Sequence, residues 1–201
     1  DKLIRKDNDS LTLHVLVTDL TRPYCDLAAA VAQFGYVAGN ASAAVCNFAL
    51  HYICDTEAHI RNILSFLARQ LSIDAHFIFT TLNGRKVFDL LKTSPEWQYT
   101  PNGATQPKYL FKRNYSGTSF APAGQTIQTL TPISRELMSE PLCNIEFIVK
   151  EAAKFGFALA ERAAFTSYRD QFAQNSLSSQ LAPEDWQYLD LWEYVVLRKV
   201  K

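Results

Sequence analysis

The chain has 201 residues, and its 20 basic residues balance its 20 acidic ones. With this balance, no overall electrostatic field attracts a long polyanion, so we do not expect a non-specific nucleic-acid coat protein. The net charge does not exclude a local basic groove. The length is enough for one domain with a sizeable core, no apolar run approaches the roughly 20 residues of a membrane span, and no signal peptide is visible.

Short apolar runs bounded by turn residues predict three strands in the first half of the chain, at residues 11–17, 43–50 and 76–82. An Ala-rich segment at 27–34 is helix-prone, and a longer helix should begin with Asp55 as its N-cap. Apolar residues between positions 60 and 71 then recur at the spacing of one buried helix face. Asn83-Gly84 indicates a turn, and residues 87–91 indicate a short helix.

Residues 95–132 differ in character from the rest, because Gly, Pro, Thr and Ser abound and apolar residues come in short bursts. We expect an inserted pair or trio of antiparallel strands there. The remaining patterns predict a helix, a strand, a helix and a strand, at 146–155, 157–165, 168–174 and 194–200. The alternation of strands and helices argues for an α/β fold, with a mostly parallel sheet covered by helices on both faces.

The most informative stretch is Asn-Phe-Ala-Leu-His-Tyr at residues 47–52, which links the second predicted strand to the helix near Asp55. A strand that ends in an amide, two aromatic rings and an imidazole is poor core material, because each polar tip needs a partner. In α/β sheets, ligands bind at the carboxyl ends of strands. This corner therefore predicts a site where a planar ligand stacks and is hydrogen-bonded, as single-stranded nucleotides are. The alternative is a core histidine beside a tyrosine at the core rim.

Three other polar side chains are candidates, and each has an ordinary structural alternative. Asp19 can accept a hydrogen bond from an exocyclic amine, such as N6 of adenine, or form an Asx turn before Pro23. Glu140 can accept from N1 and N2 of guanine, or be solvated in a loop. Tyr194 opens the last predicted strand, where half-buried tyrosines are common. Residues 108–115 interleave basic with aromatic side chains, which can track a phosphate chain or form an exposed strand face.

Metal and nucleophile chemistry have little support in the sequence. His51, Cys54 and His59 match no familiar zinc spacing, and no fourth ligand is indicated. No pattern places a thiolate beside a base, and no glycine-rich phosphate-binding motif occurs. The four cysteines form no CxxC pair and are interpreted as reduced thiols of an intracellular protein.

The stretch at 47–52 resembles the Gln-Phe-x-x-His-Tyr motif of messenger-RNA cap guanine-N7 methyltransferases, with Asn47 in place of the usual Gln. Four further landmarks resemble the same family and occur in its order over nearly the whole chain: Thr18-Asp19, residues 79–84, Glu140 ahead of residues 152–157, and residues 193–196. The nearest type is the methyltransferase domain of capping enzymes from large cytoplasmic DNA viruses, of the poxvirus and African swine fever virus type.

The resemblance implies a class I S-adenosylmethionine-dependent methyltransferase fold, Rossmann-like, with an antiparallel last strand. It implies transfer of the methyl group of S-adenosylmethionine to N7 of the guanine cap of mRNA, in the cytoplasm, without a membrane, a metal or a catalytic side chain. The implied cofactor contacts are Asp19, Asn47 and Tyr52. The implied contacts to the RNA-cap guanine are His51, Glu140, Tyr194 and Phe48, the last as a wall of the pocket.

Two family features are absent from the sequence: the Gly-rich loop after the first strand and the acidic residue after the second strand, both of which would precede Asp1. We therefore expect residues 1–201 to be a partial methyltransferase domain, with 95–132 contributing to the RNA-cap pocket and with triphosphatase and guanylyltransferase domains upstream in a longer chain. Two alternatives stay open, a methyltransferase for another substrate and a non-catalytic methyltransferase-like module that binds RNA or a partner.

Overall fold

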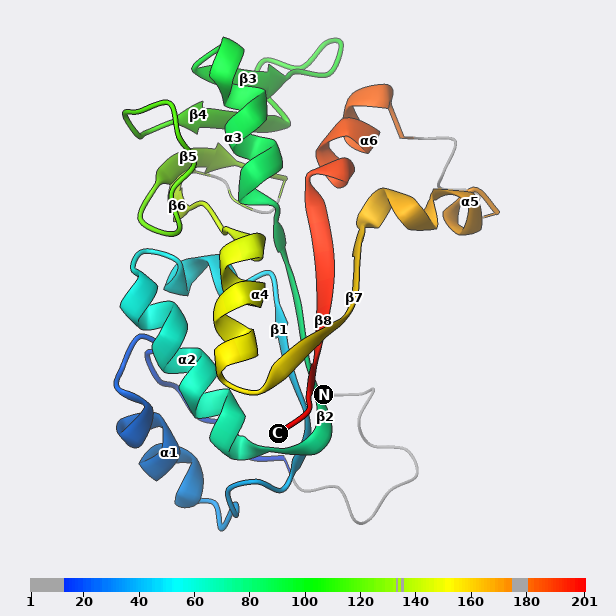
Figure 1. Ribbon diagram of the computed structural model, residues 1–201. Coiled ribbons are helices and arrows are strands. Elements are labelled where there is room, and N and C mark those ends of the chain that lie inside the picture. The colour runs from blue at the N-terminus through cyan, green and yellow to red at the C-terminus, as the bar shows by residue number, and fades with distance from the viewer. Residues whose placement is uncertain (1–12, 133, 135, 175–180) are drawn as a thin grey trace.

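Two four-stranded sheets carry the fold, and the computed structural model describes residues 13–132, 134, 136–174 and 181–201 (Figure 1). The elements of the first half are α1 Tyr24–Ala32, β1 Ala41–Asn47, the 3-10 turn η1 Leu50–Ile53, α2 Glu57–Gln70, β2 Leu71–Leu82, α3 Gly84–Thr93 and β3 Glu96–Tyr99. Those of the second half are β4 Tyr109–Arg113, β5 Thr126–Leu130, β6 Met138–Pro141, α4 Ile145–Lys154, β7 Phe157–Ala164, the 3-10 turn η2 Phe165–Tyr168, α5 Arg169–Phe172, α6 Pro183–Asp190 and β8 Trp192–Lys199.

The main sheet has the strand order β1-β2-β8-β7. β1 is parallel to β2, and β8 is antiparallel to both β2 and β7. Three strands therefore run in one direction and the last strand runs against them, as the resemblance to cap methyltransferases implies. The register sets Asn47 opposite Thr80 and Thr80 opposite Tyr194, so the ends of three strands meet at one edge of the sheet.

Helices α2 and α4 cover one face of this sheet, and α1 packs against α2 (Figure 1). The core between these helices and the sheet is apolar, with Phe79, Val195 and Leu197 fully buried. Burial of apolar surface is the main favourable term in folding. No helix in the described ranges covers the opposite face, where Val45 is 60% exposed. The expectation of helices on both faces is therefore wrong for this part of the chain.

Some predicted boundaries change because neighbouring residues compete for the same role. The cap of α2 is Thr56, whose Oγ1 accepts from the His59 N–H at 3.1 Å, and Asp55 instead bonds the His59 ring at 2.6 Å.

Residues 13–17 of the first predicted strand belong to no β-ladder, and Val17 is 96% exposed, while residues 11 and 12 lie outside the described residues. An apolar run becomes a strand only where a neighbour accepts its hydrogen bonds, and among the described residues β1 pairs with β2 alone.

The second sheet, β3-β4-β5-β6, is wholly antiparallel and stands above the main sheet in Figure 1. Its first three strands lie within 95–132, and β6 adds a fourth. Helix α6 packs on its aromatic face, where the Tyr188 ring stacks on Tyr109 at 4.0 Å. Asp185 accepts from both Lys108 Nζ and Tyr109 Oη at 2.7 Å, so Lys108 is engaged in holding α6.

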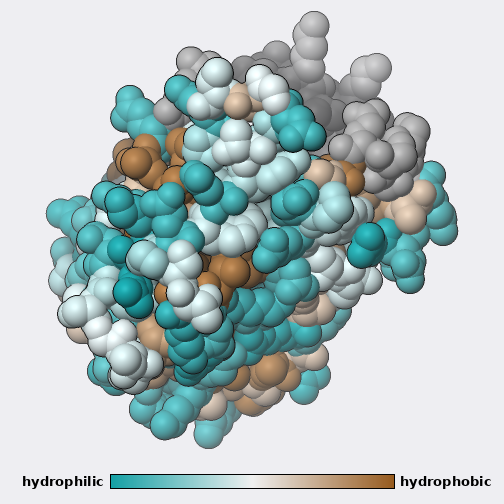
Figure 2. Space-filling view, turned by 90° about the horizontal axis from the view of Figure 1, so that it is seen from above, coloured by the Kyte–Doolittle hydropathy of each residue, from teal (hydrophilic) through white to brown (hydrophobic). Residues whose placement is uncertain are grey.

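Hydrophobic residues form small patches on the upper surface, which is otherwise largely hydrophilic (Figure 2). None of the described helices has both the length and the apolar composition needed to cross a bilayer.

Candidate nucleotide-binding cavity

A cavity of about 540 Å³ lies where the carboxyl ends of β1 and β2 meet β6, α6 and η2. We call it the aromatic cavity, because five of its lining side chains carry aromatic rings and a sixth carries an imidazole. It is lined by Phe48, His51, Tyr52, Leu82, Thr131, Ser134, Met138, Glu140, Phe165, Tyr188, Leu189 and Trp192. A concave, mostly apolar space with a few convergent polar groups is the usual form of a small-ligand site.

Phe48 turns the chain out of β1 and into the cavity wall. Its φ of 55° is left-handed, a conformation that is uncommon outside glycine and costs on the order of 1–3 kcal/mol. The Phe48 N–H donates to the carbonyl and hydroxyl oxygens of Thr80, at 3.1 and 3.0 Å, which holds this turn. The predicted strand at 43–50 therefore ends at Asn47, and the η1 turn carries His51 inward and Tyr52 outward.

His51 and Glu140 face each other across the cavity wall, with Nε2 and Oε2 separated by 3.8 Å. This distance is too long for a hydrogen bond, and His51 Nε2 is buried without any partner among the described residues. Burial lowers the pKa of His51 to about 4, so the imidazole is neutral at pH 7. Burial also raises the pKa of Glu140. A buried polar atom without a partner is costly, and a ligand between these groups would satisfy it.

Thr129 contributes a second buried polar atom that sequence reasoning missed. Its Oγ1 makes no hydrogen bond of standard geometry within the described residues, but it lies close enough to Glu140 to oppose part of the rise that burial causes in the pKa of that carboxyl. Thr129 lies on β5 opposite Met138, two residues from the β5 position that pairs with Glu140. Period-two alternation of β5, whose Ile127 and Thr129 are both buried, is the signal that would have found it.

The opposite wall is built from three rings that sequence reasoning also missed. Trp192 lies 5.0 Å from Phe48 and 6.3 Å from Phe165, measured between ring centroids. Tyr188 completes this wall, and burial raises its pKa to about 12. Edge-to-face and stacked rings at these separations attract one another. The signal in the sequence is the density of aromatic residues in α6 and at the start of β8.

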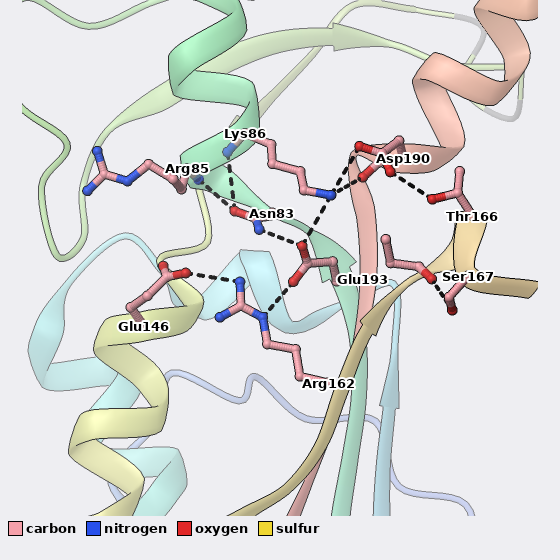
Figure 3. Close-up of polar contacts among 10 residues, drawn as sticks. Asn83, Arg85, Lys86, Glu146, Arg162, Thr166, Ser167, Asp190 and Glu193 are labelled. Atoms are coloured by element: carbon pink, nitrogen blue, oxygen red, sulfur yellow. Dashed lines mark hydrogen bonds and ion pairs between the residues drawn. The ribbon is translucent and has the colours of Figure 1, made fainter.

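A network of ion pairs and hydrogen bonds around the buried Glu193 lies directly next in sequence to two lining residues of the cavity (Figure 3). Glu193 accepts from Arg162 Nε at 2.6 Å and from Asn83 Nδ2 at 2.7 Å. Although burial opposes ionisation, these two donors hold the pKa of Glu193 below its usual value. Asn83 and Glu193 directly follow the cavity residues Leu82 and Trp192, so the network sets the positions of both.

The structure brings Phe48, His51, Tyr52 and Glu140 together in the aromatic cavity. Asn47 is exposed at the end of β1, beside Phe48 but outside the lining. Its assignment as a cofactor contact stays a prediction, as do the assigned roles of the four residues in the cavity.

Asp19 and Tyr194 do not line the aromatic cavity. Asp19 accepts from the backbone N–H and the hydroxyl of Thr21, both at 2.8 Å, which is the turn-forming alternative, and these bonds lower its pKa. Tyr194 accepts from Tyr168 Oη at 3.1 Å and donates to Glu161. The assigned roles of both residues stay predictions. Within the described ranges, no group of three or more His, Cys, Asp or Glu side chains is arranged to hold a metal ion.

No family model matches the chain. It is 26% identical to the "mRNA-capping enzyme" of African swine fever virus, both in the isolate Tick/South Africa/Pretoriuskop Pr4/1996 and in the strain Badajoz 1971 Vero-adapted, over 97% of this chain and 23% of the viral enzyme. The chain thus spans about a quarter of the length of these curated relatives.

Among solved structures, an S-adenosylmethionine-dependent methyltransferase from Clostridium acetobutylicum ATCC 824 superposes with a TM-score of 0.52 at 9% identity. The match covers 95% of this chain and 66% of that one. The chain therefore has the fold of S-adenosylmethionine-dependent methyltransferases, and its sequence is similar to a segment of a viral mRNA-capping enzyme.

Proposed function

We propose that this chain is part of an mRNA cap guanine-N7 methyltransferase, whose substrate is the 5′ guanosine cap and whose methyl donor is S-adenosylmethionine. The observation that carries the proposal is the facing pair of His51 and Glu140 in a cavity walled by aromatic rings. The methyltransferase fold and the sequence similarity to a capping enzyme support the proposal independently of the site residues.

The polar groups of the cavity match one edge of guanine. Its N1–H and N2–H lie side by side and suit the two oxygens of Glu140, and its O6, next to N1, suits a donor N–H. Neutral His51 supplies such a donor at Nε2 in one of its tautomers. Adenine has an amine at the position of O6 and no hydrogen on N1, so the same pair discriminates against adenine. The rings of Phe48 and Trp192 supply faces on which a base stacks.

The reaction requires no proton transfer to or from the protein. Guanine N7 carries an in-plane lone pair and no proton, so no general base is required. When bound, S-adenosylmethionine supplies an electrophilic methyl group on a sulfonium centre. The chain's own residues hold guanine in one orientation and exclude water. Methylation leaves guanine positively charged, so the carboxylate of Glu140 favours the developing charge while an uncharged His51 does not oppose it.

The described residues fit part of a cofactor site. Tyr52 is 55% exposed at the cavity wall, with its ring 4.1 Å from that of His51, and offers a face to a second planar ligand. The Asn47 amide is exposed at the carboxyl end of a parallel strand, the edge at which α/β sheets hold ligands. The Asp19 carboxylate is already hydrogen-bonded to Thr21 and would have to share or exchange these bonds.

Equilibrium titration of the chain with GpppG and with ApppA tests the proposal. We expect GpppG to bind and ApppA to bind at least tenfold more weakly. Equal affinities would overturn the assignment of His51 and Glu140 as guanine readers. Guanine-specific binding without methylation by the protein that carries this segment would favour the non-catalytic RNA-binding alternative.

A further inference from the structure

We propose that a second cavity, next to the aromatic cavity, binds the base of the first nucleotide that follows the RNA cap. The inference rests on the proposed function, because it extends the path of the same substrate. The second cavity, which we call the α5–α6 cavity, has a volume of about 470 Å³ and lies between η2, α5 and α6.

The two cavities share walls. Phe165 and Leu189 line both of them, so the two cavities are adjacent and these two side chains form the boundary that a ligand spanning both would cross. The Phe165 ring stacks 6.3 Å from Trp192 on the side of the aromatic cavity. The next residue, Thr166, donates to Asp190 Oδ1 at 2.7 Å and so fixes η2 against the end of α6 (Figure 3). The shared wall is therefore held in place before any ligand arrives.

The lining of the α5–α6 cavity suits a base that is followed by a phosphate. The Arg169 guanidinium lies 4.6 Å above the Trp186 ring, and Phe172 meets the same ring edge-on at 6.1 Å. Arg169 makes no ion pair within the part of the chain that the structure describes, so its charge is available. Aromatic rings beside a cation are the usual platform for single-stranded nucleic acid, because rings stack on bases while the cation meets the backbone.

Another basic and aromatic site, beside α3, fits this role less well. Arg113 and Lys92 flank a cavity of about 210 Å³ that is floored by Phe88 and Tyr115. Lys92 is paired with Asp89 at 2.6 Å, and this cavity shares no lining residue with the aromatic cavity. A nucleotide joined to the RNA cap by one triphosphate bridge therefore meets the α5–α6 cavity first.

The experiment compares three ligands on the 201-residue chain: GTP, GpppA, and a GpppA analogue whose second ribose lacks its base. Stacking of one base on an aromatic ring strengthens binding, so GpppA should bind about tenfold more tightly than the abasic analogue. Arg169→Ala and Phe172→Ala should remove most of this advantage and leave GTP affinity within twofold. Arg198→Ala is the matched control, because Arg198 is an exposed arginine on β8 outside both cavities, and it should change nothing.

Equal affinity for GpppA and the abasic analogue would overturn the inference and would leave the α5–α6 cavity as a docking site for a protein segment. An advantage that survives in both Arg169→Ala and Phe172→Ala would also overturn it. These outcomes differ from a failure of the proposed function, in which GTP and GpppA both fail to bind or bind no better than adenosine ligands.

Discussion

His51 Nε2 and Glu140 Oε2 lie 3.8 Å apart, and no described residue hydrogen-bonds that nitrogen. Both side chains are largely buried, at 7% and 16% exposed. A neutral imidazole next to a carboxylate with a raised pKa is an arrangement that favours a ligand with both an acceptor and two donors. Perturbed groups that converge on a cavity are candidates for function.

Glu140→Gln should weaken guanine binding by about 2–4 kcal/mol, because one carboxylate oxygen becomes a donor that faces guanine's own donors. Calorimetric titration with GpppG measures the loss. Glu136→Gln, at an exposed position two residues before the start of β6, is the matched control and should bind normally. Normal affinity in Glu140→Gln would show that another carboxylate reads the guanine, with Glu146 as the next candidate.

His51 should make folding stability depend on pH in the acidic range. Its pKa is near 6.5 in an unfolded chain and about 4 in the folded one, so the unfolded chain takes up the proton more readily. The stability that neutral His51 contributes is complete above about pH 6.5 and is lost as the pH falls toward 4.

Urea unfolding of the wild type and of His51→Asn, at several pH values between 4 and 7, measures this effect. The difference between the two proteins isolates it, because the raised pKa of Glu140 acts in the opposite direction in both. Parallel pH profiles for the two proteins would mean that His51 is not held in its neutral form.

Arg162→Met should destabilise the fold by about 3 kcal/mol, because it removes the closest partner of a buried carboxylate. Denaturant titration measures the change. The double variant Arg162→Met with Glu193→Leu should recover most of the loss, since no buried charge is then left without its partner. A double variant as unstable as Arg162→Met alone would contradict the ion-pair explanation and point to lost packing.

Asp19→Ala should weaken S-adenosylmethionine binding if the carboxylate contacts the adenine, because a charged hydrogen bond is then lost. Thr21→Val removes the competing hydroxyl contact and should leave this binding unchanged or slightly tighter. Calorimetry with the cofactor measures both, in the protein that carries this segment. An unchanged dissociation constant in Asp19→Ala would leave Asp19 with only its turn-forming role.

The sequence predicted the corner at Phe48, His51 and Tyr52 because polar and aromatic groups at a strand end are chemically unusual. It could not predict that Phe165, Tyr188 and Trp192 complete the cavity. Aromatic residues in such segments are ordinary core material. The docking of α6 on Tyr109 brings Tyr188 to the site, and the contacts of Trp192 with Phe48 and Phe165 join the other two rings to it. Tertiary packing of this kind leaves no local pattern.

Two predictions for the first half of the chain are wrong, and each has its own physical reason. Residues 13–17 have the composition of a strand, but strand formation depends on a neighbour that local periodicity does not report. Asp55 and Thr56 are both good N-cap residues, and the choice of Thr56 follows from the ring contact between Asp55 and His59.

The central claim is that guanine N7 is methylated by orientation and electrostatics, without a general base. It is tested most directly by a single-turnover reaction with labelled S-adenosylmethionine and a GpppA-capped RNA, followed from about pH 6 to 9, with the labelled nucleoside identified after digestion. We predict label on N7 of the terminal guanosine and a nearly flat rate at saturation, because His51 stays neutral throughout this range. Label on another atom, or a limb that rises through one ionisation in the wild type and disappears in His51→Asn, would contradict it.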